Sequence, residues 1–285
     1  MTKLEFLHKT TARLRHNAIW MPFLSATGKK INNKNWIFIV GCYNSGTTLL
    51  DQILASHPQI SGLPDEGVML TNQLTRPEDF NWQRMWSECL KEMRSSSRDQ
   101  KKDSGIIKKH WSHFYDLDCD FLVEKSISNM TRLEFFNKNF NPNIFIHIIR
   151  NPYAVAEGIY RKVEPLEGNP YHGKSYPMEI CARQWLESIN LFEKEKKNLA
   201  NYIEIKYEDL STNPAEVVNN LLEKLNLDLF PKDYFDNAFS VHEKKSKIKN
   251  MNDSSFKRLK KEDYKAINKI AKETMLKYGY EIMEE

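Results

Sequence analysis

The chain has 285 residues, of which 40% are hydrophobic and 28% are charged, and its formal net charge is +4. This length and composition allow a sizeable core and exclude a disordered or fibrous chain. The small net charge gives no argument for nucleic-acid binding. We therefore expect a globular protein whose partners do not include nucleic acid.

The N-terminal residues and the cysteines favour a cytoplasmic protein. Residues 1–20 hold no apolar run long enough for a signal peptide or a spanning helix, and we expect a short amphipathic helix that docks on the body. The four cysteines are widely spaced and form no CxxC pair, which argues against a zinc site or a disulfide framework. We expect reduced cysteines, no spanning segment and no bound metal.

The first predicted elements are a strand at 36–40 and a helix at 47–56. "WIFIV" is a short apolar run that ends at Gly41, and "TTLLDQILAS" has apolar residues at helical spacing. The loop between them contains Gly41, four further residues and Gly46. Backbone N–H groups at the start of a helix bind phosphate, and glycines let the backbone approach the anion. The order of strand, loop and helix therefore predicts an anion-binding loop.

This loop lacks the lysine of a nucleotide-hydrolysing P-loop. Thr47 follows the second glycine where such a loop has lysine, and no apolar run ends in an aspartate suited to magnesium. A P-loop kinase or NTPase is therefore a less favoured alternative. Ser45, Thr47 and Thr48 add hydroxyl donors. A tight turn with polar caps remains the structural alternative.

Strands and helices alternate along the rest of the chain. Further strands are predicted at 121–125, 143–149 and 202–207, and helices at 152–162, 178–192, 214–227 and 263–280. This alternation predicts an α/β fold with three layers, in which helices cover both faces of a central, mainly parallel sheet. We expect one domain over residues 1–285.

Two segments depart from this alternation. Residues 72–118 have weaker periodicity, with tryptophans among charges, and we interpret them as a helical insertion or lid over the site. Residues 240–262 are strongly basic. They form either a solvated face or a loop that closes on an anion.

Arg150 directly follows the predicted strand 143–149. Ligands of open parallel sheets bind beyond the carboxyl ends of the strands. Gly41 and Arg150 both lie at such ends, so they face one crevice if the two strands are neighbours. A guanidinium there can hold a second phosphate bidentately, although a structural ion pair is the alternative.

Three motifs together resemble the family of PAPS-dependent sulfotransferases, in the style of its carbohydrate and protein-tyrosine members. They are "GCYNSGTTLL" with the following "HP", the strand end "IIRNPYAVAEG", and "YEDLSTNPAEVVNNLLEKL". The resemblance runs from Trp36 to Leu225, with gaps. It implies a P-loop sulfotransferase fold and transfer of a sulfuryl group from 3′-phosphoadenosine 5′-phosphosulfate (PAPS), leaving PAP. The implied acceptor is a hydroxyl or amine on a small molecule or glycan, and no metal is required.

The resemblance also implies which residues bind the nucleotide. The first loop would hold the 5′-phosphosulfate with Tyr43, Asn44, Ser45, Gly46, Thr47 and Thr48. Arg150 would hold the 3′-phosphate, and sulfuryl transfer needs no P-loop lysine at Thr47. A late loop would cover the nucleotide through Lys247, Lys249 or Lys257, of which we select Lys249. Tyr207 would line the pocket or pack behind it.

Two positions depart from the family pattern. Asn44 stands where the family has arginine or lysine, and Gly158 stands where it has serine eight residues after the strand-end arginine. An amide donates a hydrogen bond but brings no charge. At Gly158 only the backbone remains, and Tyr160 or Arg161 could serve instead. These departures keep open a non-catalytic relative that binds a nucleotide or an anion.

The resemblance also implies a general base and a second cation, which would lie in a turn and at the end of a strand. The carboxylate that takes the acceptor's proton would be Glu66, or secondly Asp65, in "LPDEG". Lys125 in "VEKS" would stabilise the charge that develops during transfer. The alternatives are solvated turn carboxylates and a surface lysine. Residues 68–118 and 163–177 are expected to form the acceptor pocket.

Overall fold

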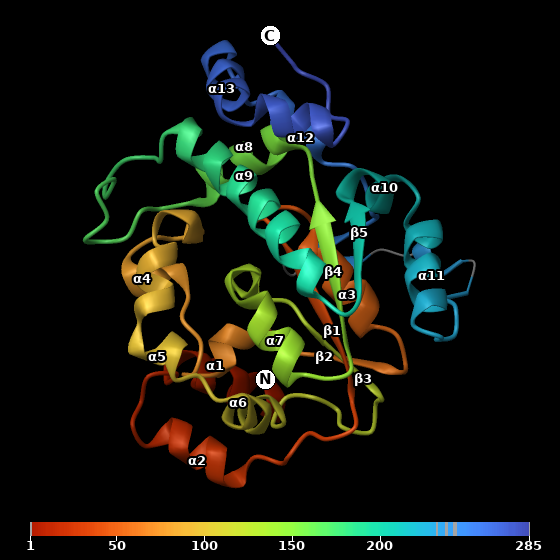
Figure 1. Ribbon diagram of the computed structural model, residues 1–285. Helices are drawn as coiled ribbons and strands as arrows, with labels where there is room; N and C mark the ends of the chain where they lie inside the picture. The colour runs from red at the N-terminus through yellow and green to blue at the C-terminus, as the bar shows by residue number, and fades with distance from the viewer. Residues whose placement is uncertain (1, 232, 237–238, 242–243, 285) are drawn as a thin grey trace.

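A five-stranded sheet forms the centre of the computed structural model, which describes residues 2–231, 233–236, 239–241 and 244–284 (Figure 1). The strands are β1 (Asn35–Gly41), β2 (Ile60–Gly62), β3 (Phe121–Glu124), β4 (Asn143–Ile149) and β5 (Tyr202–Lys206). Their order is β2-β3-β1-β4-β5, and every pairing is parallel. The predicted parallel sheet is confirmed. Strand β2 has no counterpart among the predicted elements, because three residues are too few to show a periodic pattern.

Helices cover both faces of the sheet, which confirms the predicted three layers. Figure 1 shows α10 and α11 on one side of the strands and α8 and α9 on the other. One core contains side chains of α3 (Thr47–Ala55), α10 (Tyr207–Thr212) and α11 (Pro214–Lys224). The other contains side chains of α7 (Leu133–Asn139), α8 (Pro152–Lys162), α9 (Met178–Glu195) and α13 (Lys261–Lys277).

Strand β1 contributes to both cores. Trp36, Phe38 and Val40 belong to one core, and Ile37 and Ile39 belong to the other. A parallel strand that is covered on both faces must be apolar at successive positions. This requirement explains the run "WIFIV" and makes β1 a rigid support for the loop that follows it.

The crevice expected from the sequence lies between β1 and β4. These two strands are neighbours, and Gly41 of β1 pairs with Ile148 of β4. From β1 the chain continues to β2 at one edge of the sheet, and from β4 it continues to β5 at the other edge. Connections that leave in opposite directions open a crevice at the carboxyl ends of the strands. Gly41 and Arg150 therefore lie side by side, as predicted.

The N-terminal segment and the segment 72–118 form a largely helical region beside the sheet. The elements of this region are α1 (Lys3–Arg13), α2 (Trp20–Thr27), η2 (Pro77–Phe80), η3 (Trp86–Glu88), α4 (Leu90–Ser95), α5 (Ser97–Gln100) and α6 (Ser104–Trp111). Trp86 and Trp111 are fully buried, and the Trp111 ring lies 6.0 Å from the ring of Trp36. These two tryptophans are part of the core.

The basic segment 240–262 contains regular elements where the sequence suggested a loop. Strands β6 (Phe239–Val241) and β7 (Lys244–Ser246) pair antiparallel, and α12 (Asn252–Phe256) follows. Residues 242 and 243 lie outside the described residues. Strands of three residues carry too short a pattern to be recognised in the sequence. The remaining short helices are η1 (Gly67–Leu70), η4 (Ile127–Arg132), η5 (Lys196–Asn198) and η6 (Tyr234–Asp236).

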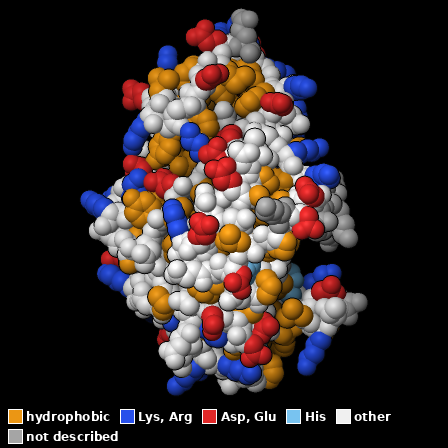
Figure 2. All heavy atoms as spheres, turned by 90° about the vertical axis from the view of Figure 1, so that its right-hand side faces the viewer, with side chains coloured by type: hydrophobic (Ala, Val, Ile, Leu, Met, Phe, Trp, Pro, Cys, Tyr) orange, Lys and Arg blue, Asp and Glu red, His pale blue; other side chains and the backbone are white. Residues whose placement is uncertain are grey.

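The surface is mixed in charge. Figure 2 shows Lys and Arg side chains intermixed with Asp and Glu side chains over one face, in keeping with the small net charge. Within the described ranges, no helix combines the length and the apolar character needed to cross a bilayer.

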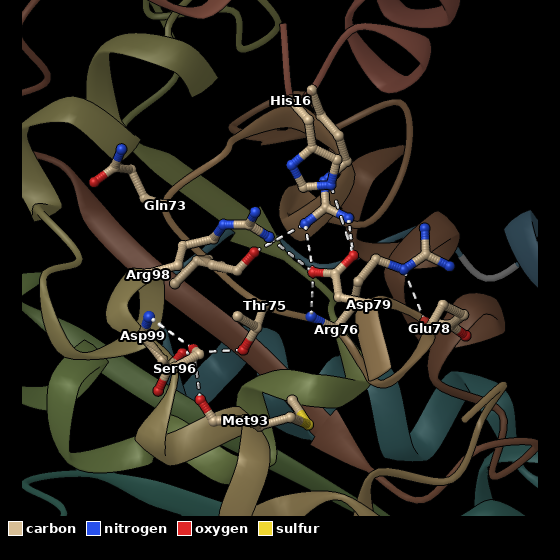
Figure 3. A network of polar contacts seen from close by, with 12 residues as sticks. His16, Gln73, Thr75, Arg76, Glu78, Asp79, Met93, Ser96, Arg98 and Asp99 are labelled. Atoms are coloured by element: carbon tan, nitrogen blue, oxygen red, sulfur yellow. Dashed lines mark hydrogen bonds and ion pairs between the residues drawn. The ribbon is translucent and has the colours of Figure 1, made fainter. Parts of the chain in front are cut away.

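A buried ion pair fastens the helical region to η4, the short helix that follows β3. Arg132 donates from Nε to Asp99, from Nη1 to the Ser128 carbonyl at 3.1 Å and from Nη2 to the Thr75 carbonyl at 2.7 Å. The side chains of Arg132 and Asp99 are 1% and 6% exposed. Figure 3 shows how the network continues from Thr75 and Asp99 to Ser96.

We expect Arg132→Met to lower the free energy of unfolding by about 3–5 kcal/mol, because it leaves the Asp99 carboxylate buried without its charge partner. Urea denaturation measures the change. Lys138→Met is the matched control, since Lys138 pairs with Glu134 on the exposed surface. Its removal should leave the urea concentration at the unfolding midpoint nearly unchanged. Equal midpoints for the two variants would contradict the anchoring role of Arg132.

Candidate active site

A cavity of about 610 Å³ lies at the carboxyl ends of β1 and β4. Most of the predicted site residues line it, namely Tyr43, Asn44, Gly46, Thr47, Thr48, Asp65, Glu66, Lys125, Arg150, Gly158, Tyr207 and Lys249. Ser45 is buried next to these residues, within the same loop. The structure therefore gathers into one place residues that lie up to 206 positions apart in the chain.

The loop after β1 presents unused hydrogen-bond donors. Asn44 and Gly46 adopt left-handed backbone conformations, with φ of 61° and 92°. A Cβ atom at Gly46 would lie 2.5 Å from the Tyr207 ring, so only glycine fits there. Helix α3 starts at Thr47 without a side-chain cap. Ser45 Oγ is buried without a hydrogen-bond partner among the described residues. Free donors at a helix start suit a bound anion.

Arg150 joins the end of β4 to this loop. Its Nη1 donates to the Asn44 carbonyl at 2.6 Å, and its Nε donates to Asn252 Oδ1 at 2.8 Å. The guanidinium lies 4.1 Å from the centre of the Tyr207 ring, and the residue is 8% exposed. Within the described part of the chain, no carboxylate lies at ion-pair distance from Arg150. The structure therefore does not show the structural ion pair that the sequence left open.

Tyr207 connects the loop to the late basic segment. Its hydroxyl donates to the Lys249 carbonyl at 3.3 Å and accepts from the Met251 backbone N–H at 3.2 Å. Tyr207 thus both lines the cavity and packs against the loop. Lys247 and Lys249 line the cavity, whereas Lys257 does not.

Arg258 is a further cation at the cavity that sequence reasoning missed. Its Nη2 donates to Glu157 Oε2 at 3.0 Å. Hydrogen bonds from Arg258 and Ser255, with the charge of Arg161, hold the pKa of Glu157 below its ordinary value, although burial acts in the opposite direction. Arg258 lies among several similar lysines and arginines in the sequence, and nothing in that run distinguishes it.

Lys125 and Glu66 form an ion pair in the cavity wall, with 3.1 Å between Nζ and Oε1. Burial opposes the charge on Lys125, but Glu66 and Asp51 hold its pKa above the ordinary value. Lys125 is therefore a cation at neutral pH. Burial also raises the pKa of Asp51 to about 7, and the charge of Lys125 opposes this shift. Asp51, one turn into α3, was not predicted from the sequence.

A buried carboxylate positions the turn that carries Glu66. Glu124, at the end of β3, accepts from the Gly67 backbone N–H at 2.9 Å, and Ser126 Oγ accepts from the Val68 N–H at 3.1 Å. Burial raises the pKa of Glu124 to about 7, and hydrogen bonds from Ser126 and Gly67 oppose the rise. The turn is thus fixed to the strand that supplies Lys125.

Asp65 is held differently from Glu66. Its Oδ2 lies 3.2 Å from His8 Nε2 in α1, and its Oδ1 accepts from the Glu66 backbone N–H at 2.7 Å. Asp65 is exposed, whereas Glu66 is half-buried. Of the two candidate bases, Glu66 is the one in contact with Lys125.

The two departures from the family pattern, Asn44 and Gly158, lie against each other. A Cβ atom at Gly158 would lie 2.9 Å from Asn44 Cγ. Lys162, one helical turn after Gly158, donates from Nζ to Asn44 Oδ1 at 2.9 Å. Of the two residues named as substitutes, Tyr160 is exposed and absent from the cavity lining, whereas Arg161 lines the cavity and pairs with Glu157.

Lys162 was missed by sequence reasoning, although the spacing signals it. Residues four apart on a helix share a face, so Gly158 predicts a neighbour at position 162. Residues two apart, such as Gly158 and Tyr160, face different directions.

Among the described residues, no group of three or more histidines, cysteines or carboxylates is arranged to hold a metal ion.

Comparisons with known proteins identify the family of the chain. The model of the sulfotransferase family matches residues 36–232. The solved sulfotransferase domain from the curacin biosynthetic pathway is 22% identical, with a TM-score of 0.55 over 88% of this chain and 99% of that one. Sulfotransferase STF9 from Mycobacterium avium is 12% identical, with a TM-score of 0.50 over 96% of this chain and 82% of that one.

A third solved structure, mouse sulfotransferase SULT7A1 complexed with PAP, is 10% identical, with a TM-score of 0.47 over 92% of this chain and 91% of that one. Among curated proteins, none matches the chain significantly. The family model covers well over half of the chain, and the five-stranded parallel sheet flanked by helices agrees with it. The chain therefore belongs to the sulfotransferase family.

Proposed function

We propose that the chain transfers a sulfuryl group from PAPS to a hydroxyl or amine of a small-molecule or glycan acceptor. One observation carries the proposal. The anion-binding loop and the Arg150 guanidinium meet at one cavity, where Arg150 Nη1 donates to the Asn44 carbonyl at 2.6 Å. PAPS carries anionic groups at the 3′ and 5′ positions of its ribose, and a loop with free donors beside a buried cation suits such a ligand.

In this proposal each wall of the cavity binds a different part of the nucleotide. The backbone N–H groups and hydroxyls of residues 45–48 hold the 5′-phosphosulfate, and Arg150 holds the 3′-phosphate. The part of the basic segment that carries Lys249 would cover the nucleotide, because Tyr207 already fastens Lys249 and Met251 to the cavity wall.

Glu66 and Lys125 would perform the chemistry. Glu66 takes the proton from the acceptor hydroxyl, whose oxygen then forms a bond to sulfur. The bond from sulfur to the 5′-phosphate oxygen breaks, and its electron pair stays on PAP. Lys125 stabilises the charge that develops on the transferring group and holds the Glu66 carboxylate in place through the 3.1 Å ion pair. The products are a sulfated acceptor, PAP and a proton on Glu66.

The acceptor would enter from the side of the helical region. Met69, Arg76 and Arg84 line the cavity there, while no residue of 163–177 does so within the described chain. We propose that the beginning of segment 72–118 forms the lid. Trp86 and Trp111 of this segment are buried and do not offer a stacking surface, whereas Trp82 is partly buried.

The main alternative is a relative that binds a nucleotide or an anion without turnover, because Asn44 brings no charge and Gly158 brings no side chain to the site. Thermal unfolding with PAP, with ATP and magnesium, and without ligand separates the alternatives. We expect PAP to stabilise the fold, by about 2.7 kcal/mol at a hundred times its dissociation constant, and ATP with magnesium to have little effect.

A shift with ATP and magnesium but none with PAP would contradict the proposal and favour a P-loop kinase. Stabilisation by PAP, without sulfate transfer to any of a panel of hydroxyl and amine acceptors, would favour the non-catalytic relative.

A further inference from the structure

The side chain of Asn44 is enclosed by helix α8. Lys162 Nζ donates to Asn44 Oδ1 at 2.9 Å, while Asn44 Nδ2 is buried without a hydrogen-bond partner among the described residues. A lysine or arginine at position 44 would have a longer side chain than asparagine and would carry its charge further from the backbone. Lys162 Nζ lies 2.9 Å from Asn44 Oδ1, so an ammonium sits at the end of the shorter side chain that occupies this position.

Gly158 makes this arrangement possible. Its absent side chain leaves room for Asn44, and a Cβ atom there would lie 2.9 Å from Cγ, 3.1 Å from Cβ and 3.2 Å from Nδ2 of Asn44. Such distances are too short for an ordinary contact, so serine at 158 would displace Asn44. The two departures from the family pattern therefore depend on each other, because Asn44 occupies the space that a side chain at position 158 would need. Lys162 contacts Asn44 in the same place.

The ammonium of Lys162 is available for an anion. Among the described residues, no carboxylate forms an ion pair with Lys162, whereas the adjacent Arg161 pairs with Glu157 at 2.9 Å. Lys162 lines the cavity together with Arg84 and Arg150. Unpaired cations that converge on one cavity attract an anionic ligand.

The geometry points to Lys162 as the residue that supplies, from helix α8, the positive charge that Asn44 lacks, and that binds the sulfuryl end of PAPS. This inference rests on the proposed function, since it concerns how the same site holds the same nucleotide. Asn44 orients the ammonium through its Oδ1 atom, and Gly158 provides the space for that contact.

The charge state of Lys162 is consistent with this role. Desolvation lowers the pKa of Lys162 to about 8, and the charges of Arg84, Arg161 and Arg150 act in the same direction, while Glu157 opposes them. An incoming anion relieves the repulsion between these cations, so binding of the sulfuryl group favours the protonated amine.

Affinities for PAPS and PAP in calorimetry test the inference. We expect Lys162→Met to weaken PAPS binding roughly tenfold to a hundredfold, the effect of a lost charged hydrogen bond, and to weaken PAP binding much less, because PAP has no sulfuryl group. Lys174→Met is the matched control, since Lys174 is an exposed lysine outside the cavity lining and its removal also deletes one charge. We expect it to change neither affinity.

The double variant Asn44→Lys with Lys162→Met returns the charge to the loop and is expected to recover most of the PAPS affinity. Position 44 has a left-handed backbone conformation, which asparagine tolerates better than lysine. The new lysine could therefore distort the loop, and unchanged affinity for PAP in the double variant shows that the loop is intact. Unchanged PAPS affinity in Lys162→Met, or an equal loss of PAPS and PAP affinity, would overturn the inference and leave the proposed function standing. A wild-type chain that binds neither nucleotide would overturn the proposed function itself.

Discussion

Arg150→Ala is expected to abolish the stabilisation by PAP, with affinity falling about a hundredfold or more. The guanidinium is 8% exposed and stacks on Tyr207, so it is fixed before any ligand binds. Charged hydrogen bonds to a phosphate contribute about 1.5–3 kcal/mol each, and a bidentate pair loses two of them at once. Thermal unfolding and calorimetry with PAP measure the loss.

Adenosine 5′-phosphate provides the ligand control, because it lacks the 3′-phosphate. The wild-type chain should prefer PAP to adenosine 5′-phosphate, and this preference should disappear in Arg150→Ala. Arg150→Met keeps an apolar side chain packed on the Tyr207 ring. It therefore serves as a second variant, in which a loss of PAP binding is less easily explained by misfolding. A PAP response that survives in both variants would show that the 3′-phosphate binds elsewhere.

Glu66→Gln is expected to lower kcat by roughly 10²–10⁴-fold, the usual contribution of a general base, with little change in the KM for PAPS. The amide keeps the size of the carboxylate and can still contact Lys125, which lies 3.1 Å from Glu66 in the native chain. The capacity to take the proton is lost, together with the negative charge that pairs with Lys125. PAP release in the presence of an acceptor from the panel measures the rate.

Asp65→Asn distinguishes the two neighbouring carboxylates. Asp65 is exposed and contacts His8, so we expect a much smaller effect on kcat than from Glu66→Gln. A larger loss in Asp65→Asn than in Glu66→Gln would assign the base to Asp65, the second candidate from the sequence.

The parts of the fold that local patterns determine were predictable. Strands β1 and β4 are covered on both faces and are therefore mostly apolar, so their runs stand out in the sequence even though β4 includes the buried His147. The loop after β1 combines glycines with a following helix, and Arg150 marks the end of β4. Because parallel strands end at one edge of the sheet, these local signals placed the loop and Arg150 at the same edge. The structure supplied the remaining condition, that β1 and β4 are neighbours.

Features that depend on distant contacts were not predictable from such patterns. The Arg132–Asp99 pair joins residues 33 positions apart, and no periodicity reports it. The spacing from Gly158 places Lys162 on the same helix face, but its contact with Asn44, 118 positions away, has no signal in the sequence. Strands β6 and β7 have three residues each, and in the described part of the chain they pair with one another.

A crystal structure of the chain with PAP tests the central claim most directly. The account predicts the 5′-phosphate at the backbone N–H groups of residues 45–48 and the 3′-phosphate at the Arg150 guanidinium, with the segment that carries Lys249 against the nucleotide. PAP bound outside this cavity, or bound in it with the 3′-phosphate away from Arg150, would contradict the account.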